Sequence, residues 1–397
     1  MRRLWVFLLL VGPVSLAQGP LREIKVAISM PTGRMRMADV VVPFSMLRQA
    51  APGINAGSLI VTAGRLELPS QVDDLDGDGK ADELVFQIGL LPGRTREVTI
   101  AYGDPDPIYR KRSDYPRRTY ALFANKIEGV GWESERNAWR LYFDPRNAID
   151  LYGKRRWPMF LDILATPEYI YHLESPNGRD IYKVGNAIGI GAVGAWADGK
   201  VVKVADVASR KWRIISNGPV RSVIELTYEG WKVGNKAITL RSRIEQWAGE
   251  RGFFHTITAD GADGMTFATG LPMKPAVPVF RSDGSSPAWL ATYGEQVVQP
   301  GETATEEQKG TNLGLAVVML DGTASAQQDA LNYLLAFSLQ NGSARWYVAA
   351  AWDQEGMNNS FHDSHEPPAL KTENEFLAWL AQRREELTSP VAVKILP

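Results

Sequence analysis

The chain has 397 residues, of which 45% are hydrophobic and 22% are charged, and it contains no cysteine. This apolar fraction excludes a disordered chain, and the balance of 44 Lys+Arg against 45 Asp+Glu gives no basic surface for nucleic acid. The lack of cysteine excludes disulfides, thiolate metal sites and a cysteine nucleophile.

Residues 1–17 have the pattern of a cleaved export signal. A basic start precedes a short apolar run, and Ser15 and Ala17 are the small residues expected before a cleavage site. The apolar run is shorter than the roughly 20 residues that span a bilayer. We therefore expect a periplasmic or secreted bacterial protein without a membrane anchor, since exported eukaryotic domains usually carry disulfides.

The mature chain reads as two β domains. Short strand-like runs separated by Pro, Gly and Asp predict an N-terminal β-sandwich over residues 18–105, and residues 104–117 read as a linker. Residues 118–397 contain longer strands, including a hairpin formed by 220–228 and 237–247. One amphipathic helix is predicted near the end, at 373–387, with Thr372 as its cap. The predicted class is all-β with a short C-terminal helix.

An acidic loop at residues 73–83 has the spacing of a calcium loop. Asp74, Asp76, Asp78 and Asp82 occupy positions 1, 3, 5 and 9, and Lys80 offers its carbonyl at position 7. Position 12 is not the glutamate of an EF-hand, and the flanks read as strands. We expect a shorter structural calcium site between strands and no organic cofactor; a solvated acidic turn is the alternative.

The predicted hairpin has one apolar and one charged face. Arg243 and Trp247 share the charged face of 237–247, and His255 follows in the next strand. This face is either solvent-exposed or a sugar-binding groove, in which arginines bind carboxylates and Trp247 stacks on a ring. His255 is also consistent with a satisfied core histidine.

Residues 131–189 contain the densest polar chemistry in the chain. His172, between Tyr171 and Glu174, is our candidate for proton transfer near neutral pH. His362 and His365 form a possible metal pair, although a solvated loop is favoured. The candidate substrate-binding residues in and beyond this segment are Arg136, Trp139, Asn147, Asp150, Asp180, Lys183, Asn186, Arg243, Trp247 and His255.

Several motifs together resemble one bacterial exported family, domain of unknown function 4861. They are 71–79, 133–144, 146–150 and 183–186, and the resemblance covers most of the mature chain. Members of this family are typically found beside pectin- and uronate-degrading enzymes. The resemblance implies that the second domain is similar to the galactose-mutarotase-like supersandwich, whose concave face binds sugars. It supplies no catalytic residues to transfer.

These observations predict a carbohydrate-active enzyme that acts on uronate-containing, pectin-like oligosaccharides. For β-elimination, Arg136, Arg140 or Lys183 would hold the uronate carboxylate, and His172 or Tyr171 would remove the C5 proton. Trp139 and Trp247 lie among charged residues in the sequence and are predicted to be sugar platforms.

The sequence leaves further functions open. Hydrolysis needs two carboxylates, for which Glu135 with Asp150 or Asp180 are the candidates. A non-catalytic sugar-binding protein, a mutarotase-type isomerase and a structural partner in a degradative complex are also consistent with the sequence. We expect a monomer whose partner is the oligosaccharide.

Overall fold

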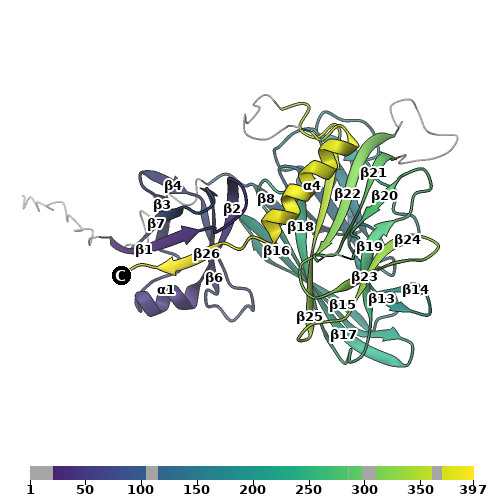
Figure 1. Ribbon diagram of the computed structural model, residues 1–397, viewed down its shortest axis with the longest axis horizontal. Coiled ribbons are helices and arrows are strands. Elements are labelled where there is room, and N and C mark those ends of the chain that lie inside the picture. The colour runs from purple at the N-terminus through teal and green to yellow at the C-terminus, as the bar shows by residue number, and fades with distance from the viewer. Residues whose placement is uncertain (1–20, 104–114, 285, 297–309, 360–368) are drawn as a thin grey trace, which may run out of the picture.

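The computed structural model describes residues 21–103, 115–284, 286–296, 310–359 and 369–397. The predicted signal peptide, most of the predicted linker, and His362 and His365 lie outside these ranges. The described chain forms two β-rich units that lie side by side (Figure 1). Within the described ranges, no helix has the length and hydropathy needed to cross a bilayer.

The smaller unit is a sandwich of two antiparallel sheets around one apolar core. Its strands alternate, so that Val26 and Ile28 are buried while Lys25 is exposed. One sheet has the order β26 (Ala392–Ile395), β1 (Arg22–Ser29), β7 (Thr95–Tyr102), β3 (Leu59–Ala63) and β4 (Leu66–Leu68). The other has the order β2 (Arg36–Pro43), β6 (Glu83–Leu90) and β5 (Ser70–Asp73), with α1 (Phe44–Ala50) after β2.

The last strand of the chain belongs to this smaller unit. β26 pairs antiparallel with β1, with Ile395 opposite Val26, and Figure 1 shows the two strands side by side. Val393 and Ile395 pack against the small core. The predicted second domain, 118–397, therefore ends before β26, because the chain returns to complete the first sheet.

The larger unit places one eight-stranded antiparallel sheet against two five-stranded sheets, and all three contribute to one large core. The large sheet has the order β15 (Ser209–Asn217), β16 (Arg221–Val233), β17 (Lys236–Trp247), β18 (Gly252–Asp260), β25 (Ser343–Trp352), β22 (Thr311–Met319), β21 (Trp289–Gln296) and β20 (Val279–Arg281). The first five-stranded sheet has the order β12 (Gly178–Asp180), β11 (Ile149–Lys154), β10 (Asn137–Tyr142), β9 (Gly129–Ser134) and β8 (Thr119–Ala124). The second has the order β14 (Lys200–Lys203), β13 (Val193–Ala197), β19 (Phe267–Pro272), β24 (Asn332–Phe337) and β23 (Ala324–Gln328). The all-β prediction is confirmed.

The predicted C-terminal helix is present as α4 (Glu373–Leu387). Thr372 caps it by accepting from the Glu375 amide, and Glu375 completes the predicted capping box. Phe376 and Leu380 pack on the outer face of the eight-stranded sheet. A Cβ on Gly314 in β22 would lie 2.5 Å from the Phe376 ring, so this close approach requires glycine.

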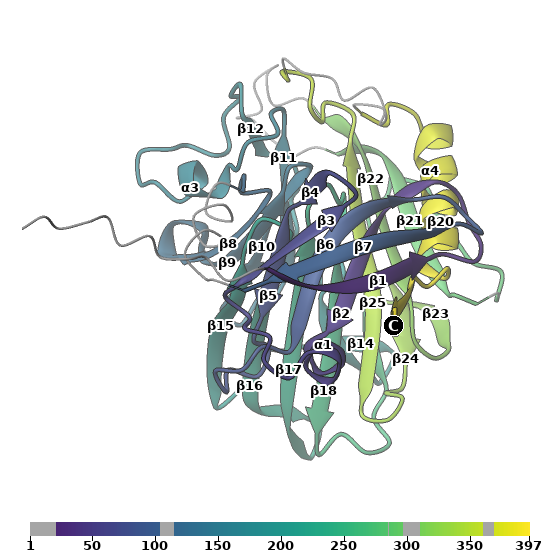
Figure 2. The same ribbon diagram turned by 90° about the vertical axis from the view of Figure 1, so that its left-hand side faces the viewer.

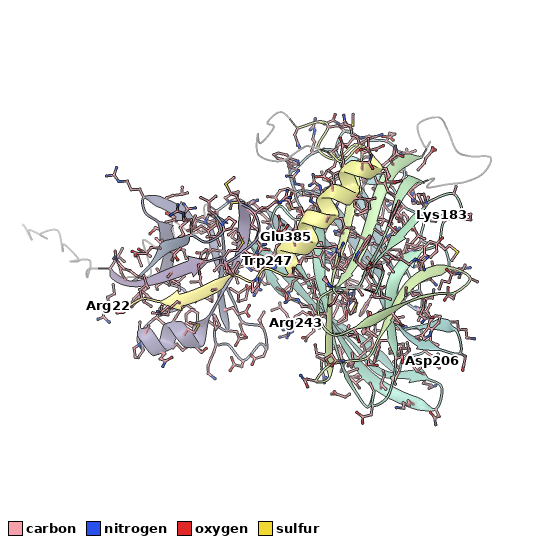
Figure 3. All side chains as sticks on the ribbon, in the orientation of Figure 1. Arg22, Lys183, Asp206, Arg243, Trp247 and Glu385 are labelled. Atoms are coloured by element: carbon pink, nitrogen blue, oxygen red, sulfur yellow. The ribbon has the colours of Figure 1, made fainter. Side chains whose placement is uncertain are left out.

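The two units meet through a mixed interface. Val85 of the small unit packs with Val220 and Trp247 of the large sheet. Beside this contact, the Arg221 guanidinium donates to buried Asp73 at 2.7 Å. Figure 3 labels Trp247 where the units join. Apolar packing and a buried ion pair therefore fix the small sandwich on the back of the large sheet.

A second group of charges lies where both units meet α4. The Glu250 carboxylate contacts Arg383 of α4 at 2.8 Å and accepts from the Tyr347 hydroxyl at 2.8 Å. Burial, with the negative charge of Asp39 nearby, raises the pKa of Glu250 to about 7. Burial also raises the pKa of Asp39, which comes from β2 of the small unit. Glu386 adds a further negative charge.

We expect this interface to make the protein more stable in mild acid. Folding raises the pKa of Glu250. This residue therefore contributes its full stabilisation of the folded state at pH values below its pKa in the unfolded chain, and the stabilisation is lost as pH rises toward about 7. The melting temperature should therefore fall between about pH 5 and pH 8, on the order of a few degrees. In Glu250→Gln the fall of the melting temperature with pH should be smaller, whereas the variant Glu295→Gln at an exposed site should keep it. An unchanged fall in Glu250→Gln would contradict the role of Glu250 in this pH dependence.

Candidate active site

The polar segment predicted from the sequence converges on the outer face of the first five-stranded sheet. Along β10, Trp139 and Leu141 point into the large core, so that Arg140 and Tyr142 point to the other face. Arg140 and Asp150 are direct cross-strand partners of β10 and β11. α3 (Leu161–Leu164) and β12 lie on this side of the large unit, opposite α4 (Figure 2).

A single buried guanidinium is shared by two carboxylates at this position. The Arg140 side chain is only 3% exposed and donates to Asp150 Oδ2 from Nε at 3.0 Å and from Nη2 at 2.7 Å. Asp180 Oδ2, from β12, lies 3.5 Å from Nη2. The Tyr142 hydroxyl also donates to Asp150, at 3.0 Å. The network is thus held by three neighbouring strands, which makes its geometry rigid.

Two carboxylates against one cation leave the network short of positive charge. Burial, and next the charge of Asp180, raises the pKa of Asp150 to about 6. Burial alone would lower the pKa of Arg140, but Asp150 and Asp180 outweigh it and raise that pKa, so the guanidinium stays charged. The pKa of Tyr142 is raised by burial and by Asp150, so its hydroxyl keeps its proton.

Tyr171 and His172 form the accessible part of the cluster. The His172 side chain is 40% exposed, and its Nδ1 lies 3.4 Å from Asp180 Oδ2. The Tyr171 hydroxyl accepts from Arg140 at 3.4 Å, and the Tyr171 carbonyl accepts the Asp180 amide at 2.7 Å. This contact is not a hydrogen bond: His172 Nδ1 is buried and has no hydrogen-bond partner among the described residues. Because Nδ1 faces the carboxylate, Nε2 is the ring nitrogen left for a ligand.

One lysine, Lys126, flanks this opening. The Lys126 ammonium lies 5.8 Å from the centre of the Tyr171 ring. Lys183 is exposed, and its carbonyl accepts from the Lys274 ammonium at 2.6 Å. Lys274 lies 5.0 Å from the centre of the Tyr182 ring; burial, and next the charge of Lys183, lowers its pKa. Lys126 and Lys274 were missed by the sequence analysis, because neither lies within the polar segment and no local pattern marks them.

Two further predicted residues, Asn147 and Asn186, lie in other surroundings. Asn147 is buried and has a positive φ of 40°, which asparagine tolerates. Asn186 is exposed, and its carbonyl accepts from Lys203 at 3.2 Å.

Glu135 and Arg136 lie in other contacts and do not join the cluster. Glu135 pairs with Arg118 and accepts the Gly249 amide at 2.6 Å. Arg136 is buried against Glu355 at 3.1 Å. Both residues sit at the turn between β9 and β10, away from the Arg140–Asp150 pair. The catalytic role of Glu135 and the substrate-binding role of Arg136 stay predictions that the His172 cluster does not support.

The predicted sugar platforms are buried. Trp139 is 0% exposed and packs edge-on against Phe253 at 4.9 Å, so no sugar can stack on it. Trp247 is covered by the small unit. The charged face of β16 and β17 is the outer face of the sheet, where Arg243 pairs with Glu225 at 3.0 Å. The groove prediction is therefore wrong, because the concave side of these strands is filled by core.

His255 is a core histidine. It is 1% exposed, and its ring lies against Trp346 at 4.3 Å while Nδ1 contacts the Gly191 carbonyl at 3.1 Å. Burial lowers its pKa to about 4, so the ring is neutral at physiological pH. The prediction that His255 binds substrate is wrong for this reason.

The acidic loop folds as its spacing predicts. Carboxylate oxygens of Asp74, Asp76 and Asp78 lie within 4.8 Å of one another. The Asp74 carboxylate accepts the amides of Gly77 and Gly79 at 2.7 and 2.8 Å. Lys80 places its ammonium 2.9 Å from Asp78, and Asp82 accepts the Leu75 amide at 2.7 Å. The convergent oxygen donors have the chemistry that calcium requires.

Comparisons with known proteins found, among other matches, two solved structures, one sequence relative and one family model. Two solved Enterococcus faecalis structures cover 94% of this chain: one described as a protein in the glycosyl hydrolase family 38 (TM-score 0.50, 7% identity), the other an α-mannosidase (TM-score 0.48, 8% identity). The chain spans about half of each, 47% and 46%. Uncharacterized protein P7 of Formosa agariphila is 23% identical over 359 residues, which is 83% of this chain and 82% of that protein. The model of the family described as Domain of unknown function (DUF4861) matches residues 32–393, and the chain belongs to this family, as its motifs indicated.

Proposed function

We propose that the protein is an exported, monomeric carbohydrate-active enzyme that cleaves uronate-containing oligosaccharides by β-elimination. The observation that carries this proposal is the half-exposed His172, which lies beside buried Asp180 and next to Tyr171, whose ring is close to the Lys126 ammonium. A proton-transfer group beside a cation suits a substrate with a carboxylate beside an acidic C–H bond. One structural neighbour is described as a protein of a glycosyl hydrolase family, which agrees with a sugar substrate.

The elimination assigns one task to each group. Lys126, Lys183 or Lys274 binds the uronate carboxylate and stabilises the charge that develops as C5 loses its proton. His172 Nε2 takes the C5 proton, the C4=C5 double bond forms, and the C4–O4 bond breaks. The Tyr171 hydroxyl gives its proton to the departing oxygen. Proton transfer from His172 to Tyr171 through solvent then restores both groups.

Arg140 has a different role from the one predicted. Its guanidinium is buried and already bound to Asp150 and Asp180, so it cannot also receive a substrate carboxylate. It is a positioning residue, which holds Asp180 behind His172 and donates to the Tyr171 hydroxyl. Hydrolysis by Glu135 with Asp150 or Asp180 is disfavoured, because Asp150 and Asp180 are buried against Arg140 while Glu135 is bound elsewhere, by Arg118.

A panel of uronate oligosaccharides distinguishes the candidate functions. Growth of the absorbance of an unsaturated uronate supports elimination. New reducing ends without that absorbance support a hydrolase, and binding without either product supports a sugar-binding protein or an isomerase. Neither product nor binding for any member of the panel would contradict a uronate substrate altogether.

We also propose a structural calcium ion in the loop of Asp74, Asp76 and Asp78. The loop lies against the large unit, since Arg213 of β15 donates to the Leu75 carbonyl at 3.0 Å. The ion would be held by these carboxylates together with the Lys80 carbonyl and Asp82. Its role would be to fix a loop at the junction of the two units.

Calcium is therefore expected to stabilise the protein. At a calcium concentration about 100 times Kd, stability rises by ~2.7 kcal/mol, and a chelator should lower the melting temperature by several degrees. The variant Asp76→Asn/Asp78→Asn should lose this response, whereas exposed Asp260→Asn should keep it. Absence of both calorimetric heat and a melting shift on calcium addition to the wild-type protein would refute the site.

A further inference from the structure

One tryptophan, Trp212, differs from all the others in the described part of the chain. It is 44% exposed, whereas the other described tryptophans are buried or half-buried. Trp212 lies on β15, the edge strand of the eight-stranded sheet, opposite Leu226 of the core. Its position on the core-facing side of an edge strand places it where the sandwich is open to solvent.

The indole is held in a defined orientation. Its ring stacks on Phe123 of β8 with centroids 4.9 Å apart and planes 2° apart. Phe123 is in turn supported edge-on by Phe143 at 6.1 Å. An exposed indole fixed in this way offers a flat apolar face at little entropic cost, which is the surface that the C–H face of a sugar ring contacts.

The stacked pair of Trp212 and Phe123 is connected to the His172 cluster by two short routes. Phe123 precedes Lys126 by three residues, at most about 10 Å of chain, and the Lys126 ammonium lies 5.8 Å from the Tyr171 ring. Phe143 directly follows Tyr142, whose hydroxyl donates to Asp150. Figure 2 shows β15 on the same side of the molecule as α3 and β12, with the stacked pair on the core-facing side of the edge strand β8 and the cluster on the outer face of the first sheet.

Basic side chains lie on this side together with two carboxylates. The Arg146 guanidinium lies 3.9 Å from the Tyr142 ring centroid and pairs with both Asp144 and Glu128. Arg210 lies two residues from Trp212 on the same face of β15, and Lys203 is near enough to Arg146 for that charge to lower its pKa, after burial. A chain of acidic sugars has the complementary charge.

We propose that Trp212 is a second sugar-binding subsite, at which one ring of an acidic oligosaccharide stacks while another ring occupies the His172 cluster. The inference rests on the proposed function and deepens it, because it makes the substrate an oligosaccharide of several rings. We expect a disaccharide bound at His172 not to reach Trp212, so that the contribution of the subsite depends on chain length.

Steady-state kinetics on uronate oligosaccharides of increasing length test this subsite. Trp212→Ala should raise KM for the longest oligosaccharide about tenfold and leave both KM for the disaccharide and kcat unchanged. Trp212→Phe should recover most of the affinity. Lys211→Ala, on the opposite face of β15, is the matched control and should change neither parameter. In a binding experiment, long oligosaccharides should quench tryptophan fluorescence more in the wild type than in Trp212→Ala.

The outcomes separate the subsite from the function it rests on. Wild-type protein that neither turns over nor binds any uronate oligosaccharide overturns both. Turnover in which Trp212→Ala has no effect, or the same effect at every length, overturns the subsite alone. A folded Trp212→Ala variant with an altered oligomeric state would also overturn it, because the ring would then be an interface between copies of the chain.

Discussion

Replacing His172 with alanine is expected to abolish most turnover and to leave binding intact. Loss of a positioned acid–base group typically costs 10²–10⁴-fold in rate. The side chain is half-exposed and its closest charged contact is one carboxylate, so its removal should leave the fold stable. The measurements are kcat on uronate oligosaccharides and Kd of the same ligands for the variant, by calorimetry.

Two variants refine this expectation. Leu173→Ala removes an exposed neighbour and should keep wild-type kcat. Asp180→Asn should lower kcat less than His172→Ala does and should shift the pH profile, because it removes the charge that faces Nδ1. A His172→Ala protein that is well folded and retains wild-type kcat would exclude His172 as the base.

Replacing Arg140 with methionine is expected to destabilise the protein by ~3–5 kcal/mol, because it leaves two buried carboxylates without their cation. The loss should be smaller in mild acid. The pKa of Asp150 is already raised to about 6, so its carboxyl becomes neutral as pH falls below that value and then needs no partner. Urea unfolding at about pH 5 and about pH 8 measures both effects.

Arg241 provides the control for this prediction. It forms an exposed pair with Asp260 at 2.7 Å, and Arg241→Met should cost no more than about 1 kcal/mol at either pH. Combining Arg140→Met with Asp150→Asn should recover part of the lost stability, since one unpaired charge is removed. Equal costs for Arg140→Met and Arg241→Met would mean that the network of Arg140 is not the buried ion cluster described above.

Local pattern predicted the elements of the fold well. The hairpin of β16 and β17, the capped helix α4 and the acidic loop all follow from residues close together in the chain. The return of β26 to β1 was missed, because four residues with alternating burial do not reveal their partner. Sheet partners separated by most of the chain depend on tertiary packing, which periodicity does not contain.

Part of the candidate site was predicted because its residues, too, are close together in the chain. Arg140, Asp150, Tyr171, His172 and Asp180 lie within one segment, and short strands bring them together. Trp139 is next to Arg140 in sequence, but alternation places the two side chains on opposite faces of β10, one in the core and one in the cluster. The charged neighbours of Trp139 in the sequence therefore led to the wrong prediction that this residue is a sugar platform.

Trp247 and Trp212 show the limit imposed by tertiary structure. Both lie on strands of the large sheet with charged neighbours. Trp247 lies on the outer face, which the small unit covers, whereas Trp212 lies on the core-facing side of the edge strand β15 and is exposed there. Which outer surface is covered depends on how two separate units dock. No pattern within either strand carries that information.

The proposed reaction begins when His172 takes the C5 proton of a uronate. Proton NMR of the products formed from a defined uronate oligosaccharide tests this step most directly. We expect a vinyl proton from a C4=C5 double bond at the new non-reducing end in wild-type reactions, and none with His172→Ala. Cleavage that yields only saturated ends, or an unsaturated product formed equally by His172→Ala, would contradict it.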